Sequence, residues 1–219
     1  MSEANTNPEQ SIFEGDSWSE LSSIFSHLPE PVMLTVWGDG DGSHGERQAA
    51  HLCQTLADNF DTIQFRLLPR RVNYPYYPVI GVMGYQEEEE VDFGVRIIGL
   101  PAGYQMTSLI TAIQAVSFRG ATVEPGTRIK MHKLAADVTL ELMSAADNEG
   151  GPLVAKIIFG LAVINPHVRS YLIMSDRFPE ANLRYSVNII PHLVINGRVH
   201  LEGVVDEDAV VRHIAKAVT

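Results

Sequence analysis

The clearest structural signal lies near the C-terminus, where residues 190–197 read Ile-Pro-His-Leu-Val-Ile-Asn-Gly. The apolar run His192 to Ile195 is suited to a strand, and a second run, Arg198 to Leu201, follows it. Asn-Gly between two such runs predicts a tight hairpin, because both turn residues need positive φ. The helix Asp206 to Ala217 comes next, with acidic residues in its first turn that complement the helix dipole. The C-terminal part therefore ends in a proline, a hairpin and a helix.

A strand-helix-strand segment precedes this hairpin. Its elements are the strand Val138 to Met143, the apolar helix Pro152 to Ile164, the strand Val168 to Met174 and a helix over Arg177 to Tyr185. Two strands joined through a helix form a parallel pair with a right-handed crossover. The hairpin then completes a four-stranded mixed sheet with helices on both faces.

The first half of the chain repeats this order after an amphipathic stretch, Trp18 to Leu28. A β-rich apolar run, Val32 to Trp37, precedes one apolar helical face, made of Ala49, Leu52, Cys53, Leu56 and Phe60. The remaining predicted elements are strands over Thr62 to Leu67, Val79 to Met83 and near Phe93 to Ile98, and a helix over Tyr104 to Ser117. Pro78 stands before the first hairpin strand, as Pro191 does in the second half.

We therefore expect an α/β protein built from two tandem units of one fold. Its 219 residues fit one large domain or two domains of roughly 100 residues each, and the repeated order of elements favours two. Unit 1 is expected over residues 16–120 and unit 2 over residues 121–219. Residues Arg119 to Lys133, rich in Gly, Thr, Pro and charge, are the expected join. Residues 1–15 are polar and are expected to be a flexible N-terminal tail.

Three stretches carry a resemblance to a known family. They are residues 99–109 (Gly-Leu-Pro-Ala-Gly-Tyr-Gln-Met-Thr-Ser-Leu), the segment 152–166 ending Val-Ile-Asn-Pro, and residues 190–197. Each unit resembles the thioredoxin fold in its glutaredoxin-like form. The two units in tandem resemble the archaeal-type protein disulfide oxidoreductases and the N-terminal domain of the alkyl hydroperoxide reductase flavoprotein.

The resemblance implies thiol–disulfide exchange by a Cys-x-x-Cys pair directly before the proline that opens the helix of unit 2. The four positions before Pro152 are Asn148, Glu149, Gly150 and Gly151, so neither cysteine is present. The equivalent loop of unit 1, around residues 42–45, has none either. Exchange needs a thiolate and a second thiol that resolves the mixed disulfide. The family activity is therefore not expected here, and no catalytic residue is assigned.

Cys53 is the only cysteine of the chain. It lies on the apolar stripe of its helix, and such a site buries a thiol and raises its pKa. We expect a small buried core residue. The alternative is an oxidoreductase component in thiol–disulfide or peroxide chemistry, acting through Cys53 or through a partner's thiols.

Pro191 could act without thiols. The resemblance implies a cis bond before it, which would turn the backbone of Ile190 outward, beside the loop 148–151. An extended peptide could then bind by strand addition in a groove made of Pro152, Ile190, Pro191 and His192. His192 is expected to be a surface or edge histidine. The alternative is that Pro191 serves folding alone.

The charge and histidine content argue against several classes of binding partner. The chain has 16 Lys and Arg against 27 Asp and Glu, a net charge of −11, which argues against nucleic acid or an anionic membrane as main partner. The eight histidines show no metal-binding spacing, so neither a metal nor a cofactor is expected. No secretory signal or membrane span is indicated, and a cytoplasmic location is expected.

The predicted function is protein binding. We expect an adaptor, an assembly factor, a homo-oligomer or a subunit of a larger complex, with a protein partner at the Pro191 groove. The acidic run Glu87 to Glu90, with Asp92, is expected to be a solvated hairpin tip, and the alternative is a dock for a basic partner.

Overall fold

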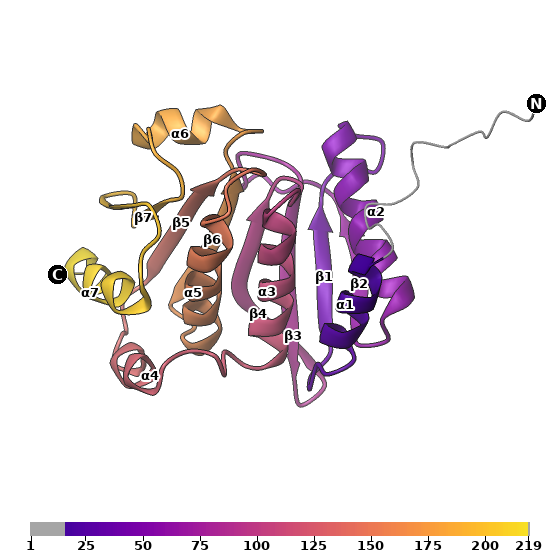
Figure 1. The fold of residues 1–219 in the computed structure, drawn as a ribbon, viewed down its shortest axis with the longest axis horizontal. Coiled ribbons are helices and arrows are strands. Elements are labelled where there is room, and N and C mark those ends of the chain that lie inside the picture. The colour runs from indigo at the N-terminus through magenta and orange to yellow at the C-terminus, as the bar shows by residue number, and fades with distance from the viewer. Residues whose placement is uncertain (1–15, 219) are drawn as a thin grey trace, which may run out of the picture.

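The computed structural model describes residues 16–218, so the predicted tail 1–15 lies outside the described residues. The helices are α1 Asp16–Phe25, α2 His44–Asn59, α3 Gln105–Ser117, α4 Pro125–His132, α5 Gly151–Ile164, α6 Pro179–Tyr185 and α7 Glu207–Ala217. The strands are β1 Val32–Trp37, β2 Ile63–Leu68, β3 Val79–Gln86, β4 Glu89–Ile98, β5 Val138–Ser144, β6 Val168–Met174, β7 His192–Ile195 and β8 Val199–Glu202. The α/β architecture of two tandem units is confirmed (Figure 1).

The strands form one continuous sheet in the order β2-β1-β3-β4-β6-β5-β7-β8. Unit 1 contributes β1–β4 and unit 2 contributes β5–β8, and within each unit the strands follow the same order. The two four-stranded sheets join because β4 pairs with β6 in parallel, from Val95 opposite Ser170 to Ile98 opposite Ile173. This pairing covers one edge of each unit and leaves only β2 and β8 as edges of the described sheet.

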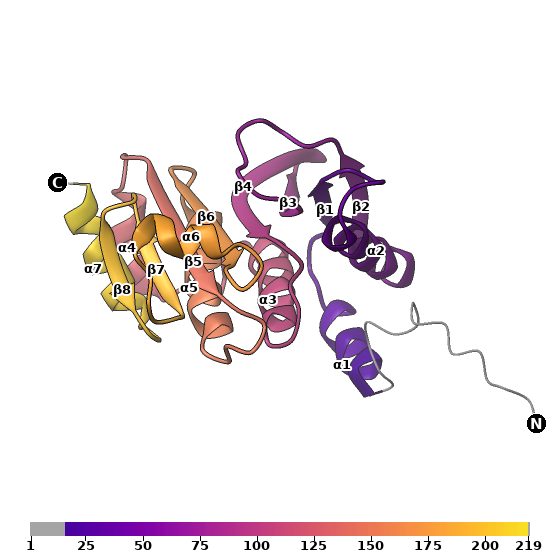
Figure 2. The same ribbon diagram turned by 90° about the horizontal axis from the view of Figure 1, so that it is seen from above.

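The two faces of the sheet are covered differently. One face packs against α1, α2, α3, α5 and α7 in the larger apolar core, and α3 and α5 lie side by side at its centre (Figure 1). The other face is covered in unit 2 by α6 and in unit 1 by the irregular connection between β2 and β3 (Figure 2). Tyr74, Tyr76 and Tyr77 of that connection pack on Trp37 and its neighbours. Tyrosine rings thus replace a helix over this half of the sheet.

The two units share one detail around their prolines. The Tyr77–Pro78 and Ile190–Pro191 peptide bonds are both cis, the geometry expected for Pro191. The Pro78 carbonyl accepts a hydrogen bond from Gly99 N at 2.8 Å, and the Pro191 carbonyl accepts one from Gly203 N at 2.8 Å. Both glycines have positive φ, which residues with a Cβ rarely adopt. The repeat seen in the sequence therefore extends to the backbone hydrogen bonds at each hairpin.

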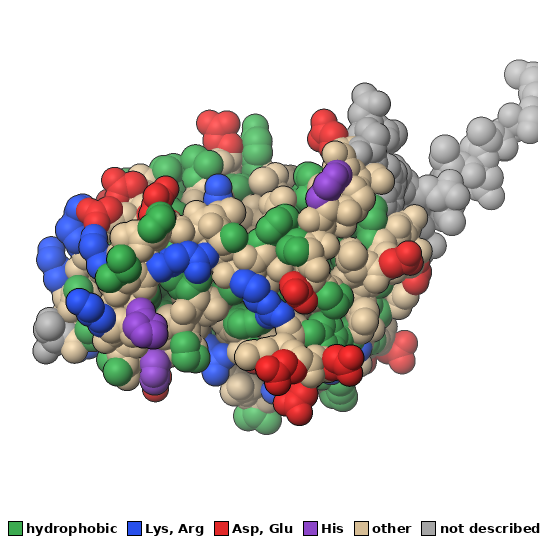
Figure 3. Space-filling view, turned by 90° about the horizontal axis from the view of Figure 1, so that it is seen from below, with side chains coloured by type: hydrophobic (Ala, Val, Ile, Leu, Met, Phe, Trp, Pro, Cys, Tyr) green, Lys and Arg blue, Asp and Glu red, His purple; other side chains and the backbone are tan. Residues whose placement is uncertain are grey.

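The structure adds detail to two predicted segments. The expected join 119–133 contains a short helix, α4, whose Thr127 and Met131 are buried. Glu87 and Glu88 do form the tip of the β3–β4 hairpin, both with positive φ, and Figure 3 shows acidic side chains gathered there. The hairpin tip extends beyond the neighbouring strands, because β1 pairs with β3 only up to Met83 and β6 pairs with β4 only over Val95–Ile98.

Candidate functional site

The loop between β5 and α5 occupies the place of the missing dithiol. Among the predicted positions, Asn148 is half-buried, Glu149 is exposed, and Gly150 and Gly151 are buried, Gly151 being the first residue of α5. The loop lies beside Pro191, since a Cβ on Gly150 would lie 3.4 Å from Pro191 Cδ. The structure therefore brings the two parts of the predicted site together.

Asn148 links the loop to the proline segment. Its Nδ2 donates to the carbonyl oxygen of Ile190 at 3.1 Å, and its Oδ1 accepts from Ser144 Oγ at 3.3 Å. Its backbone N–H donates to the Ala145 carbonyl at 3.1 Å. The amide side chain thus uses the Ile190 carbonyl that an added peptide strand would need.

Unit 1 fixes this loop of unit 2. The fully buried Gln105, at the start of α3, donates from Nε2 to the carbonyls of Ala145 at 3.0 Å and Asn148 at 2.9 Å. Its Oε1 accepts from Ser108 Oγ at 2.8 Å, and Tyr104 N donates to the Ala146 carbonyl at 2.9 Å. The sequence analysis did not assign Gln105 to the site, although it lies within the stretch 99–109.

The loop has no room for larger side chains at its two glycines. A Cβ on Gly151 would lie 2.2 Å from Ser144 Oγ and 2.7 Å from Gln105 Nε2. A Cβ on Gly150 would lie 2.6 Å from Val204 Cγ2. Real Cβ atoms do not approach other atoms so closely, so the packing around the loop is built for glycine.

An apolar rim surrounds the loop. Four large apolar side chains near the loop are exposed. Each is next to the loop or to Ile190 in sequence, or contacts the loop: Tyr104 (51%), Leu153 (59%), Ile189 (55%) and Val204 (55%). Within the predicted groove, Ile190 is half-buried, whereas Pro152 and Pro191 are buried. Large exposed apolar side chains grouped around one loop are typical of a binding surface.

The expectation that His192 lies at the surface is wrong. Its side chain is 2% exposed, because β7 is paired on both sides and places His192 between Met143 of β5 and Glu202 of β8. Its Nε2 lies 2.9 Å from Nδ1 of His200. Burial, followed by the neighbouring His200, lowers the pKa of His192. The neutral ring therefore belongs to the packing of the sheet and does not line an open groove.

Cys53 is fully buried on α2, as its place on the apolar stripe predicted. Burial raises the pKa of its thiol far above the usual range. A thiol in this state has neither the access nor the thiolate character that exchange needs.

The equivalent loop of unit 1 holds a buried carboxylate. Glu46 accepts hydrogen bonds from Asp39 N and Ser43 N, both at 2.9 Å, and from Arg70 Nε at 2.7 Å. Ser43 Oγ also accepts from Glu46 N, which completes a capping box at the start of α2. Arg70 is the main cause of the lowered pKa of Glu46, which falls to about 2 although burial opposes the shift.

Two absences concern the described part of the chain. Within residues 16–218, no group of three or more His, Cys, Asp or Glu is placed to hold a metal ion. In the same range, no helix is long and apolar enough to cross a membrane.

Known proteins with similar sequences are much longer than this chain. No family model matches the chain. The alkyl hydroperoxide reductase protein AhpF of Pseudomonas putida is 24% identical over 185 residues, 84% of this chain and 34% of that protein. A protein named NADH dehydrogenase from Ferdinandcohnia aciditolerans is 21% identical over 192 residues, 88% of this chain and 35% of that protein. The chain thus spans about a third of the length of the curated relatives that it matches.

Two solved structures superimpose on most of this chain. The structure of AhpF from Enterococcus faecalis superimposes with a TM-score of 0.84 at 18% identity and covers 93% of this chain and 100% of that chain. A protein disulfide oxidoreductase from Aeropyrum pernix gives a TM-score of 0.83 at 18% identity, covering 93% of both chains. The chain has a tandem thioredoxin fold. This fold confirms the resemblance seen in the sequence, and with a single cysteine the chain lacks the Cys-x-x-Cys pair.

Proposed function

We propose that this protein is a tandem thioredoxin-fold binding protein without dithiol chemistry, which holds a segment of a protein partner at the loop 145–151 and Pro191. The observation that carries the proposal is the apolar rim of Tyr104, Leu153, Ile189 and Val204 around a loop that contains no nucleophilic thiol. Similar proteins with this fold are redox proteins by name, and this chain keeps their architecture without their thiols.

The hydrogen bonds around Ile190 define how a segment would bind. Asn148 uses the carbonyl, whereas the Ile190 N–H has no hydrogen-bond partner among the described residues. An incoming strand would therefore accept one backbone hydrogen bond and gain most of its affinity from apolar contacts with the rim. The loop itself is fixed by Gln105, so little ordering would be needed on binding.

The alternative is an oxidoreductase component working through Cys53, as the redox names of the similar proteins would suggest. It requires an accessible thiolate, and Cys53 is fully buried with a raised pKa. A role that depends on a partner's thiols would still need the partner to bind, and the rim around loop 145–151 is the surface on which it would do so.

The test is peptide binding by the purified protein. Short linear peptides selected from a displayed random library should be rich in apolar residues and should shift the amide signal of Ile190 in NMR spectra. Val204→Asp and Ile189→Asp should each weaken binding about tenfold or more, the loss of a contact worth roughly 1.4 kcal/mol.

Leu183→Asp is the matched control, because Leu183 is 78% exposed on α6 and lies outside the rim. Equal loss of binding in Leu183→Asp and Val204→Asp would contradict the proposal. So would catalysis of insulin reduction by dithiothreitol that is abolished by Cys53→Ser.

A further inference from the structure

A second candidate site lies on the sheet face opposite α3 and α5, where the two units meet. It is a pocket of about 470 Å³. Its floor comes from β4, β5 and β6, and its walls come from α6, the turn 196–197 and residues 73–76 of unit 1. A pocket of this size holds a small molecule or one long side chain. It shares no lining residue with the rim around loop 145–151.

Tyrosine rings dominate the pocket. Tyr74 and Tyr76 reach it from unit 1, and Tyr171 and Tyr185 from unit 2. Aromatic faces attract cations through their quadrupole, most strongly where water is excluded. One such contact is already present at the wall, where the guanidinium of Arg184 lies 5.0 Å from the ring centroid of Tyr185.

A carboxylate stands among these rings. Glu141 of β5 lines the pocket, and its Oε2 accepts a hydrogen bond from the Tyr185 hydroxyl at 2.5 Å. Burial and then Glu141 raise the pKa of Tyr185 to about 12, so the tyrosine stays protonated and donates. Among the described residues, Glu141 forms no ion pair with Lys or Arg. Arg184, the one Lys or Arg in the lining, is exposed and lies over the Tyr185 ring instead, so the Glu141 carboxylate has no direct cationic partner in the pocket.

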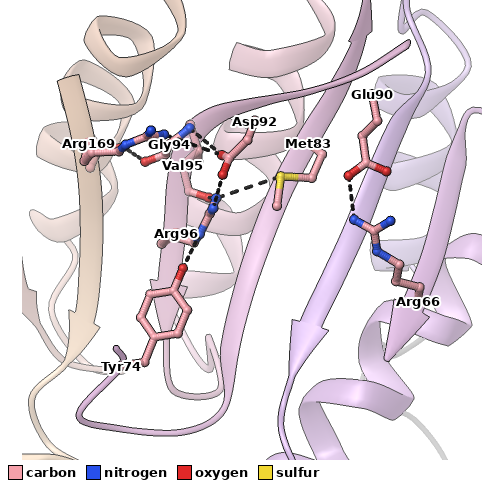
Figure 4. Close-up of polar contacts among 10 residues, drawn as sticks. Arg66, Tyr74, Met83, Glu90, Asp92, Gly94, Val95, Arg96 and Arg169 are labelled. Atoms are coloured by element: carbon pink, nitrogen blue, oxygen red, sulfur yellow. Dashed lines mark hydrogen bonds and ion pairs between the residues drawn. The ribbon is translucent and has the colours of Figure 1, made fainter. Parts of the chain in front are cut away.

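A buried arginine holds one wall of the pocket in place. Arg96 is 5% exposed and donates from Nε to the Tyr74 hydroxyl at 2.9 Å (Figure 4). Its Nη2 pairs with Asp92 Oδ2 at 2.5 Å, and its guanidinium lies 4.9 Å from the Trp37 ring centroid. Asp92 is shared with a second arginine, since its Oδ1 lies 3.9 Å from Arg169 Nη1, and the network positions Tyr74 at the wall of the pocket.

We propose that this pocket binds an organic cation, an alkylammonium or guanidinium group, which pairs with Glu141 and lies against the tyrosine faces. A free amine and a Lys or Arg side chain of a protein partner share this chemistry. The site is independent of the function proposed above, since neither its residues nor its ligand belong to the rim.

The experiment uses agmatine, which carries both cationic groups, in calorimetric titrations of the full chain. Glu141→Gln removes the charge and keeps an acceptor for Tyr185, so it should weaken agmatine binding about tenfold. Added salt should weaken the wild-type affinity as well, because the contact is electrostatic. Glu180→Gln is the control, since it removes one charge from an exposed position on the same side of unit 2, in α6.

Circular dichroism and thermal unfolding verify that each variant is folded. Tyr171→Leu is a second variant, which should weaken agmatine binding while leaving Glu141 in place. No agmatine binding at millimolar concentration, or equal weakening in Glu141→Gln and Glu180→Gln, would overturn the proposal. An uncharged analogue, N-butylacetamide, should not bind, and its binding at the same affinity would also overturn it. A short peptide with one lysine that binds more tightly than agmatine, and loses affinity in Glu141→Gln, would assign the cation to a protein partner.

Discussion

The loops before α2 and α5 occupy the same place in the two units and are held by opposite chemistry. In unit 1 the buried carboxylate of Glu46 accepts from two backbone N–H groups and from Arg70. In unit 2 two neutral amides, Asn148 and Gln105, make the corresponding contacts. A charged side chain thus fixes the loop of unit 1, whereas neutral amide side chains fix the loop of unit 2.

This difference determines what each surface can do. The unit 1 loop, residues 38–43, consists of Gly, Asp and Ser and presents no apolar side chain. The unit 2 loop is surrounded by exposed apolar residues, and α5 begins without a side-chain cap. The same backbone repeat therefore carries a loop of Gly, Asp and Ser in unit 1 and a loop bordered by exposed apolar side chains in unit 2.

The largest expected effect is at Gly151. Gly151→Ala places a Cβ into contact with Ser144 and Gln105, and overpacking of this kind costs about 3 kcal/mol. Denaturant titration should show a lower midpoint for unfolding. If Gly151→Ala is as stable as the wild type, Gln105 does not hold this loop as tightly as its hydrogen bonds indicate.

Glu46 should make the stability of unit 1 depend on pH. Glu46→Gln should lower the free energy of unfolding at pH 7 by about 2 kcal/mol, because buried donors and Arg70 lose a charged acceptor. The folded pKa of Glu46 is depressed from 4.5 to about 2, so its stabilising effect is full above pH 4.5 and is lost as the pH falls toward 2. Unfolding measured from pH 7 to pH 2 should therefore show a shallower acid decline for the variant.

Glu149→Gln is the matched control in the other loop, where the carboxyl group is exposed, and its pH profile should follow the wild type. Some acid decline should remain in Glu46→Gln, since Asp92 and Asp208 also have lowered pKa values through their ion pairs. If stability falls with pH as steeply in Glu46→Gln as in the wild type, the charge of Glu46 does not stabilise the loop of unit 1.

The repeat itself could be predicted from the sequence because local patterns encode it. The strands Val32–Trp37, Val168–Met174 and His192–Ile195 were predicted with their observed ends, and most other ends were predicted to within two residues. The pairing of β4 with β6 could not be predicted, since pairing between two strand edges depends on how the units dock. The helix α4 was missed because it buries little apolar surface and contains Gly126.

The sequence predicted where the candidate site lies, but not all of the contacts that hold it together. The missing dithiol and the neighbouring Pro191 followed from the sequence, whereas Gln105 did not, because its partners lie about 40 residues away. The burial of His192 was missed for a related reason. A short strand that is apolar on both faces accepts a neutral histidine inside the sheet, and only the partner strands reveal it.

A substitution at Asn148 should have a smaller effect on stability and should also change peptide binding. Asn148→Ala should destabilise the protein by about 1 kcal/mol, the usual net value of a lost hydrogen bond, and this change should not depend on pH. It also frees the Ile190 carbonyl, so a peptide that binds the rim should bind more tightly than to the wild type. Chemical unfolding and calorimetry measure the two effects. Weaker peptide binding in Asn148→Ala would mean that Asn148 itself contacts the ligand.

Gly45 is the unit 1 counterpart with the smallest expected effect and the opposite sign. It lies in the first turn of α2, and a Cβ there would meet only Pro78 Cδ at 3.9 Å, an ordinary contact. Gly45→Ala should therefore stabilise the protein by about 0.5 kcal/mol, because alanine loses less backbone entropy in a helix. Paired unfolding curves of Gly45→Ala and Gly151→Ala should move in opposite directions. If both variants lose stability, the start of α2 is packed as tightly as the start of α5, and the two helix starts do not differ in packing.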